Sequence, residues 1–173
     1  MSSLRHLSLL LLPLSSALAE PPNAALHRAA LLEGVPEITA PGVPGAVCAF
    51  GPNAFALIAG QEGKTTLSAV VGAGEWEKGR VVAFGHDGYL ESTSHESTAR
   101  LLLNSIQWAG QNRKNPRVIV QGPSGLLEYL RSKKVNAAPG SGRNWTSNLR
   151  NADVLCLDAR QLRSAEHVPA LTE

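Results

Sequence analysis

Short apolar runs, separated by turns rich in glycine and proline, occupy residues 46–158 and constrain the fold more than any other feature. The first four lie within residues 46–85 and read AVCAF, AFALIA, TLSAVVGA and RVVAFG. Runs of this length between glycine, proline and asparagine are typical of β-strands. Several are continuously apolar rather than alternating, so we expect strands that are covered on both faces, as in an α/β layer.

A helix and then a strand–helix–strand unit follow these runs. Residues 95–109 repeat apolar side chains at the spacing of one buried helical face, with Ser94 as the expected N-cap. A strand is predicted at 117–122, a helix at 124–134 and a second strand at 152–158. This order indicates the opening of a parallel doubly wound sheet. Because two strands leave the apolar faces of such a sheet uncovered, we expect the unit to be truncated.

The predicted fold class is therefore α/β: a layered sheet with flanking helices, followed by the start of a parallel doubly wound unit, for which the family resemblance described below implies a flavodoxin-like fold. We divide the chain into a signal peptide at 1–19, a helix plus proline- and glycine-rich lead-in at 20–45, an α/β module at 46–112 and a partial doubly wound unit at 113–173. The polar sequence QNRKN marks the internal boundary.

The first segment has the pattern of a secretory signal peptide. Arg5 lies in a short basic start, an apolar stretch runs from Leu7 to Leu14, and small residues end at Ala19. The apolar stretch is shorter than the ~20 residues that span a bilayer. We therefore expect cleavage near Ala19, export to the periplasm or the medium, and no membrane span in the mature chain.

The chain contains two cysteines, Cys48 and Cys156, and each lies in an apolar, strand-like run. An oxidising compartment would allow a disulfide between them. Buried cysteines in separate strands more often pack as small hydrophobic side chains. The pairing of Cys48 with Cys156 stays open at the level of sequence.

The sequence contains parts of two catalytic motifs and lacks a third. GQEGKTT at 60–66 lacks the first glycine of a phosphate-binding loop, because that position is Ile58. In HESTA at 95–99, Ala99 stands where a zinc peptidase has its second histidine. No G-x-S-x-G nucleophile elbow occurs. The sequence therefore favours a protein without a catalytic site and without a resident cofactor.

Four residues are the best candidates for a ligand or metal site: His86, Asp87, His95 and Glu96. The first two follow the run RVVAF, at the carboxyl end of a predicted strand, where α/β proteins place ligands. The other two begin the next helix and could approach them, as a metal or acid–base site requires. Alternatively, Gly85 and Gly88 bracket His86 and Asp87 as in a tight turn, where aspartate commonly bonds nearby backbone N–H groups.

A basic stretch runs from Arg113 to Arg150 and contains eight lysine and arginine residues but only one acidic residue, Glu128. It could attract an acidic glycan or another polyanion, although a solvated face explains it as well. Within it, the turn GPSG at 122–125 offers backbone N–H groups to an anion. The formal net charge of +2 and the expected export argue against nucleic acid as a partner.

Four phrases resemble a known family: ALLEGVPEITAPGVPGAVCAFGPNAFALIAG, GRVVAFGHDGYLES, ARLLLNSIQWAG and PRVIV. They are similar to the amino-terminal region of exported bacterial proteins related to enhancin-like, mucin-targeting zinc metallopeptidases, a layout shared by the animal TRP-channel-associated factor proteins. The resemblance covers about residues 30–158. It implies a fold like that of class I glutamine amidotransferases without their nucleophile, in an accessory region whose peptidase domain lies further along the chain. It carries no catalytic residue across to this sequence.

We therefore expect a secreted, non-catalytic accessory or binding segment that lacks the peptidase domain, with glycoprotein, glycan or cell-wall material as its partner. The alternative is a small exported hydrolase or metal-binding protein that uses His86, Asp87 and His95. Neither the ligand nor the oligomeric state follows from the sequence.

Overall fold

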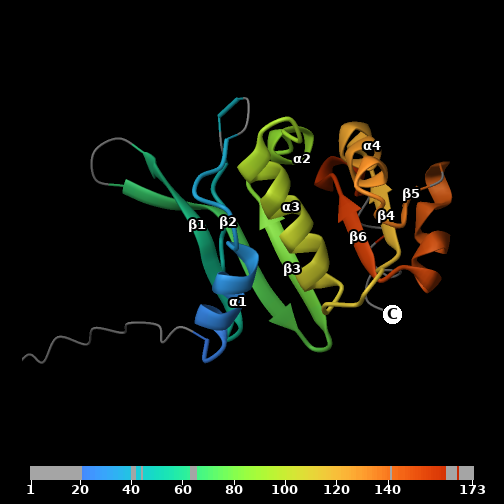
Figure 1. Ribbon diagram of the computed structural model, residues 1–173. Helices are drawn as coiled ribbons and strands as arrows, with labels where there is room; N and C mark the ends of the chain where they lie inside the picture. The colour runs from blue at the N-terminus through green and yellow to red at the C-terminus, as the bar shows by residue number, and fades with distance from the viewer. Residues whose placement is uncertain are drawn as a thin grey trace, which may run out of the picture.

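The computed structural model describes residues 21–39, 42, 43, 45–62, 66–140, 142–162 and 167. The expected signal peptide at 1–19 lies outside these residues. The sequence SAEHVPALTE also predicts a helix at 164–173, which lies outside them apart from His167. Figure 1 shows the arrangement of the elements, which in chain order are α1 (Ala24–Leu31), β1 (Ala54–Glu62), β2 (Thr66–Trp76), β3 (Gly79–Phe84), α2 (Gly88–Glu91), α3 (Glu96–Ala109), β4 (Val118–Gln121), α4 (Ser124–Ser132), β5 (Ala137–Pro139), the 3-10 helix η1 (Gly142–Asn151), β6 (Val154–Leu157) and the 3-10 helix η2 (Ala159–Gln161).

The first sheet is antiparallel, with the strand order β1-β2-β3. Phe55 pairs with Ala73, which in turn pairs with Val82. Since alternate side chains of a strand point to opposite faces, these three share one face, and they pack with Leu31 of α1 and Leu101 of α3. Helices α1 and α3 lie over this face of the sheet (Figure 1).

The second sheet is parallel, with the order β5-β4-β6. Its central strand β4 is buried along Val118, Ile119 and Val120, as expected for a parallel strand covered on both faces. Side chains of α4 complete its core together with Leu102 and Ile106 of α3. Because α3 contributes to both cores, this one helix holds the two sheets together.

The predicted α/β fold class is confirmed. The strand–helix–strand pattern at 117–158 corresponds to β4, α4 and β6, and β4 pairs with β6 in parallel as predicted. The intervening β5 was not predicted, because three residues that end in a proline carry almost no strand signal. The segment boundaries at 45/46 and 112/113 stay predictions.

One strand prediction is wrong, and another strand is longer than predicted. Residues 46–50 form no strand; Gly45 and Val47 donate their N–H groups to Gly85 and Ala69, and Phe50 is 85% exposed. Strand β2 also continues to Trp76, through glycines that the sequence suggested as a turn. In both places alanine and glycine made the sequence look apolar or flexible, although such small side chains neither require burial nor prevent strand pairing.

The expectation that the first sheet is covered on both faces holds only in part: the adjacent Val70 and Val71 of β2 are both buried, but other positions of the sheet are open to solvent. Val81 is 58% exposed and Trp76 is 74% exposed. The outer face of this antiparallel sheet is built largely from alanine and glycine. Gly72 is buried against Val47, whereas Ala56 is exposed, so little apolar area per residue remains in water.

A polar cluster fastens α1 to the sheet and to α3. The indole N–H of Trp108 donates to Nδ1 of His27 over 3.0 Å, and Arg80 lies over the Trp108 ring at 5.0 Å. Burial acts to raise the pKa of Glu75, but the hydrogen bond from Arg80 and the proximity of His27 outweigh it, so the pKa of Glu75 lies below its usual range. These contacts place a charged network at one end of the first core.

Both cysteines are free thiols. Cys48 is exposed on the segment 46–50, which corrects its expected burial in a strand, whereas Cys156 is partly buried in β6. Burial raises the pKa of Cys156 to about 12, and the thiolate is the reactive form.

We expect a thiol reagent such as Ellman's reagent to titrate Cys48 in the native protein and Cys156 only after denaturation. The variant Cys48→Ser is the control, because only Cys156 remains in it. Fast reaction of this variant in its native state would contradict the assignment.

Candidate functional site

The carboxyl ends of β3, β4 and β6 meet at one edge of the molecule. Asp87 follows β3 and Asp158 follows β6, and Arg160 binds both. The turn after β4 lies against them, because a Cβ at Gly122 would approach the Cβ of Asp158 to 2.7 Å. We call this edge, formed by His86, Asp87, Gly122, Asp158 and Arg160, the carboxyl edge.

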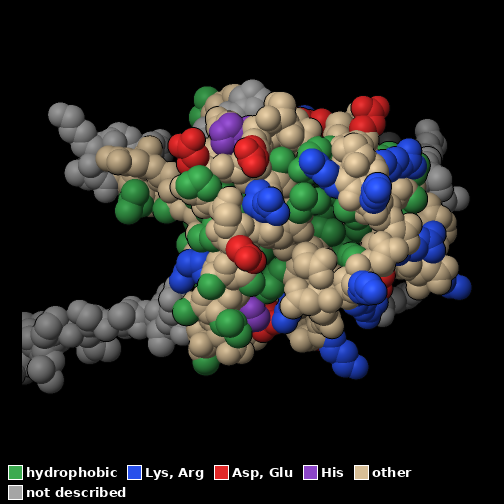
Figure 2. All heavy atoms as spheres, in the orientation of Figure 1, with side chains coloured by type: hydrophobic (Ala, Val, Ile, Leu, Met, Phe, Trp, Pro, Cys, Tyr) green, Lys and Arg blue, Asp and Glu red, His purple; other side chains and the backbone are tan. Residues whose placement is uncertain are grey.

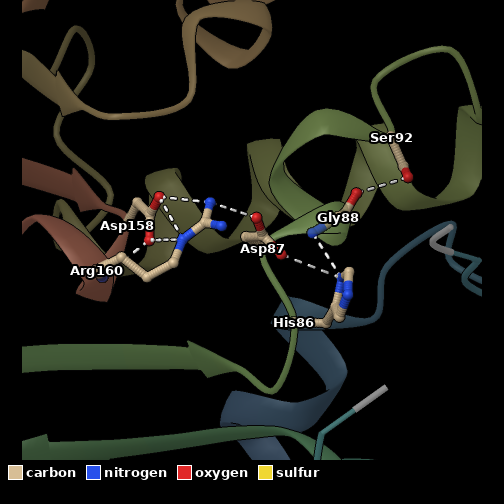
Figure 3. Close-up of polar contacts among 6 residues, drawn as sticks. All are labelled: His86, Asp87, Gly88, Ser92, Asp158 and Arg160. Carbon is tan, nitrogen blue, oxygen red and sulfur yellow. Dashed lines mark hydrogen bonds and ion pairs between the residues drawn. The ribbon is translucent and has the colours of Figure 1, made fainter. Parts of the chain in front are cut away.

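His86 is held by the turn that follows it. Its Nδ1 accepts a hydrogen bond of 2.8 Å from the backbone N–H of Gly88 and lies 3.4 Å from Oδ1 of Asp87. An imidazole that accepts at Nδ1 carries its proton on Nε2 when neutral. On that side the ring packs against Gly42, where a Cβ would come within 2.8 Å of Nε2. The glycine-bracketed turn is thus the immediate environment of the predicted histidine, as Figure 3 shows.

Arg160 joins the ends of the two sheets (Figure 3). Its Nη2 lies 2.5 Å from Oδ2 of Asp87 and 2.8 Å from Oδ2 of Asp158. Oδ1 of Asp158 accepts from both the Nε and the backbone N–H of Arg160, so Asp158 also caps η2. The side-chain hydrogen bond from Arg160 lowers the pKa of Asp158 despite its burial. One carboxylate oxygen of Asp87 therefore binds an arginine of this chain.

Sequence reasoning did not include Arg160 or Asp158 in the site. A signal for Asp158 was present, since it ends a predicted parallel strand and the carboxyl ends of parallel strands share one edge. Nothing in the local sequence around Arg160 indicates a partner 73 residues away.

The turn predicted to receive an anion lies beside a carboxylate of the chain itself. Gly122 has φ +111°, which suits glycine, and α4 begins two residues later. A Cβ at Gly125 would lie 2.5 Å from Oε2 of Glu91, which belongs to α2. A carboxylate is favoured there because a helix N-terminus carries a partial positive charge. Glu91 thus occupies the space in front of the first turn of α4.

His95 and Glu96 form a separate site at the start of α3. The N-cap of α3 is His95 rather than the predicted Ser94, and its Nδ1 accepts the backbone N–H of Thr98 over 3.3 Å. An imidazole nitrogen can replace the usual serine oxygen here because a single acceptor atom satisfies the N–H of Thr98. Glu96 is exposed in the first turn of the helix. Within the ranges that the structure describes, no three His, Cys, Asp or Glu side chains could share a metal ion.

The pH dependence of stability tests the Arg160–Asp158 contact. The pKa of Asp158 is lower in the folded protein than its ordinary value of about 3.9. Its stabilisation is therefore complete above that ordinary value and disappears as the pH falls through the folded-state pKa. We expect Asp158→Asn to lower the free energy of unfolding at pH 7 by about 1–2 kcal/mol, with a difference from wild type that shrinks on acidification.

Urea unfolding followed between pH 7 and pH 3 measures this effect. The exposed carboxylate of Glu37 provides the control, since Glu37→Gln should change the free energy of unfolding at pH 7 by no more than about 0.5 kcal/mol. An Asp158→Asn deficit that is the same at both ends of the pH range would contradict the assignment.

Comparison with known proteins gives one match. A family model described as "TRPM8, N-terminal domain" matches residues 14–168. Neither the curated proteins nor the solved structures contain a match to the chain. The matched region includes every element of both sheets and the whole carboxyl edge. Among the residues with described positions, no helix is long and apolar enough to cross a membrane.

Proposed function

Because the chain belongs to the family of the TRPM8 N-terminal domain, we propose that it is a non-catalytic binding module whose partner is a membrane channel protein. The family description names a channel, and the resemblance to TRP-channel-associated factor proteins points the same way. The module would act by docking onto its partner rather than by chemistry on a small substrate.

The observation that carries this proposal is the bonding of the carboxyl edge. In an α/β protein this edge is where a ligand or substrate would bind. Here Arg160 bridges Asp87 and Asp158, and Glu91 lies in front of α4. Arg160, Asp87 and Asp158 thus bind one another, which supports a structural role for the edge and leaves the outer surfaces for binding.

Three narrower statements belong to the same proposal. The chain is exported, with cleavage near Ala19. It corresponds to the accessory amino-terminal region of enhancin-like metallopeptidases, and its fold is related to that of class I glutamine amidotransferases. The first follows from the pattern of residues 1–19, and the other two follow from the phrases quoted above. A glycan or cell-wall partner is the second candidate, favoured by the basic stretch between Arg113 and Arg150.

Binding to a solubilised channel tests the proposal. The purified chain is immobilised, and detergent-solubilised TRPM8 is passed over it in a surface plasmon resonance experiment. An unrelated potassium channel in the same detergent is the control. We expect saturable binding of TRPM8 alone. Equal signals from both channels, or hydrolysis of a protein substrate that is lost in His86→Ala, would refute the proposed function.

A further inference from the structure

A cavity of about 330 Å³ lies between the second half of α3 and the end of α4. We call it the lysine cleft. It is lined by Leu103, Asn104, Ile106, Gln107, Lys114, Asn115, Pro116, Lys133, Lys134 and Val135. None of its lining residues belongs to the carboxyl edge.

The rim of the cleft is positively charged. Lys114 follows α3, whereas Lys133 and Lys134 follow α4, and no acidic residue contributes to the lining. Within the described part of the chain, these three lysines form no ion pair; Lys133 lies over the Tyr129 ring at 5.5 Å. The charges are therefore available to a negatively charged partner.

Lys134 occupies a position that disfavours an ordinary side chain. Its φ is +61°, in the left-handed region where a helix most often ends on glycine. The adjoining hydrogen bonds, from Lys134 N–H to Arg131 and from Val135 N–H to Leu130, are typical of such an ending. Glycine would relieve the strain of about 1 kcal/mol, so the backbone of this turn does not explain the lysine.

About half of the cleft lining is apolar. Leu103, Ile106, Pro116 and Val135 line it, and Leu103 and Val135 are only partly buried against the second core. Figure 2 shows lysine and arginine side chains gathered over the unit of α4 and the parallel sheet, with hydrophobic side chains exposed between them. Apolar side chains next to three lysines complement a segment that is apolar on one face and acidic on its flanks.

We infer that the lysine cleft docks an acidic amphipathic helix of a protein partner, with apolar side chains in the cavity and carboxylates against Lys114, Lys133 and Lys134. This inference rests on the proposed function and specifies its surface and the chemistry of the partner. A bare anion fits less well, because the carbonyl groups at the C-terminus of α4 carry partial negative charge and because half of the lining is apolar. Opposite charges across such a surface mainly accelerate association and select the partner.

The probe is a fluorescein-labelled peptide of about 15 residues with leucine at i, i+3, i+4 and i+7 and glutamate on the remaining face. Its binding to the full chain is followed by fluorescence anisotropy. We expect saturable binding that weakens with added salt. Binding should fall about tenfold or more in Lys133→Glu/Lys134→Glu, and it should be lost when the leucines of the peptide are replaced by serine.

The double variant Lys78→Glu/Arg150→Glu makes the same change in net charge outside the lining and should bind the peptide as wild type does. Equal weakening in both double variants, equal binding of the serine peptide, or full displacement by a heparin oligosaccharide of matched charge would overturn the inference in favour of a general polyanion surface.

The channel experiment separates this inference from the proposed function. If TRPM8 binds equally to wild type and to Lys133→Glu/Lys134→Glu, the cleft assignment fails and the binding module stands. If the peptide binds as expected and no channel does, the cleft stands and the proposed partner fails.

Discussion

Replacing Gly85 by alanine is expected to destabilise the protein by more than about 3 kcal/mol, because the added methyl group would collide with backbone that cannot move aside. The Cβ would lie 1.9 Å from the carbonyl oxygen of Gly45 and 3.3 Å from that of Val70. The N–H of Gly85 donates to Val70, and its carbonyl accepts from Gly45. The chain is thus held on both sides at the point where β3 passes into the carboxyl edge.

Gly79→Ala, at the other end of β3, is the matched control. A Cβ there meets only the carbonyl oxygen of Trp76 at 3.4 Å, which is ordinary contact, so we expect a change within about 1 kcal/mol. Urea unfolding monitored by circular dichroism measures both variants. If Gly85→Ala unfolds at the wild-type urea concentration, then the close contact between the backbones of Gly45 and Gly85 is wrong.

Leu101→Ala is expected to cost about 3 kcal/mol, the typical loss for a buried leucine that leaves a cavity. Leu101 is 0% exposed and packs in the first core with Phe55 and Val71. Because α3 also supplies Leu102 and Ile106 to the second core, a loosened helix should weaken both sheets together.

The exposed neighbour Arg100 provides the control, and Arg100→Ala should change the free energy of unfolding by no more than about 0.5 kcal/mol. Amide hydrogen exchange in Leu101→Ala would show whether protection falls in β2 and β4 alike. Faster exchange confined to β2 would mean that the two cores are independent.

Much of the fold follows from local patterns in the sequence. The apolar runs AFALIA and RVVAF became β1 and β3, and the helical repeat at 95–109 became α3, because each pattern matches the period of its element. The parallel pairing of β4 with β6 follows from the strand–helix–strand order. The predicted burial of residues 46–50 is wrong. Their side chains are apolar, but alanine and cysteine tolerate exposure to solvent.

The location of the candidate site could be predicted, whereas its bonding could not. His86 and Asp87 do lie at the end of a strand, as expected. Their environment depends on Arg160, which no periodicity or motif connects to Asp87. The cap formed by His95 was also missed, because histidine is rare at that position and Ser94 offered the common residue one place earlier.

The lysine cleft shows the same limit. The excess of basic residues between Arg113 and Arg150 was visible in the sequence, and it suggested a polyanion. Only the fold brings Lys114, Lys133 and Lys134 to the same cavity as Leu103 and Ile106. This combination of charge and apolar area changes the expected partner from a polyanion to an acidic amphipathic segment.

The most direct test of the account compares two variants for binding to detergent-solubilised TRPM8. Asp87→Asn alters the carboxyl edge, and Lys133→Glu/Lys134→Glu alters the lysine cleft. If the chain works by binding and the edge is structural, Asp87→Asn binds the channel with wild-type affinity while the cleft variant loses about tenfold or more. Loss of binding in Asp87→Asn with full binding by the cleft variant would contradict the account.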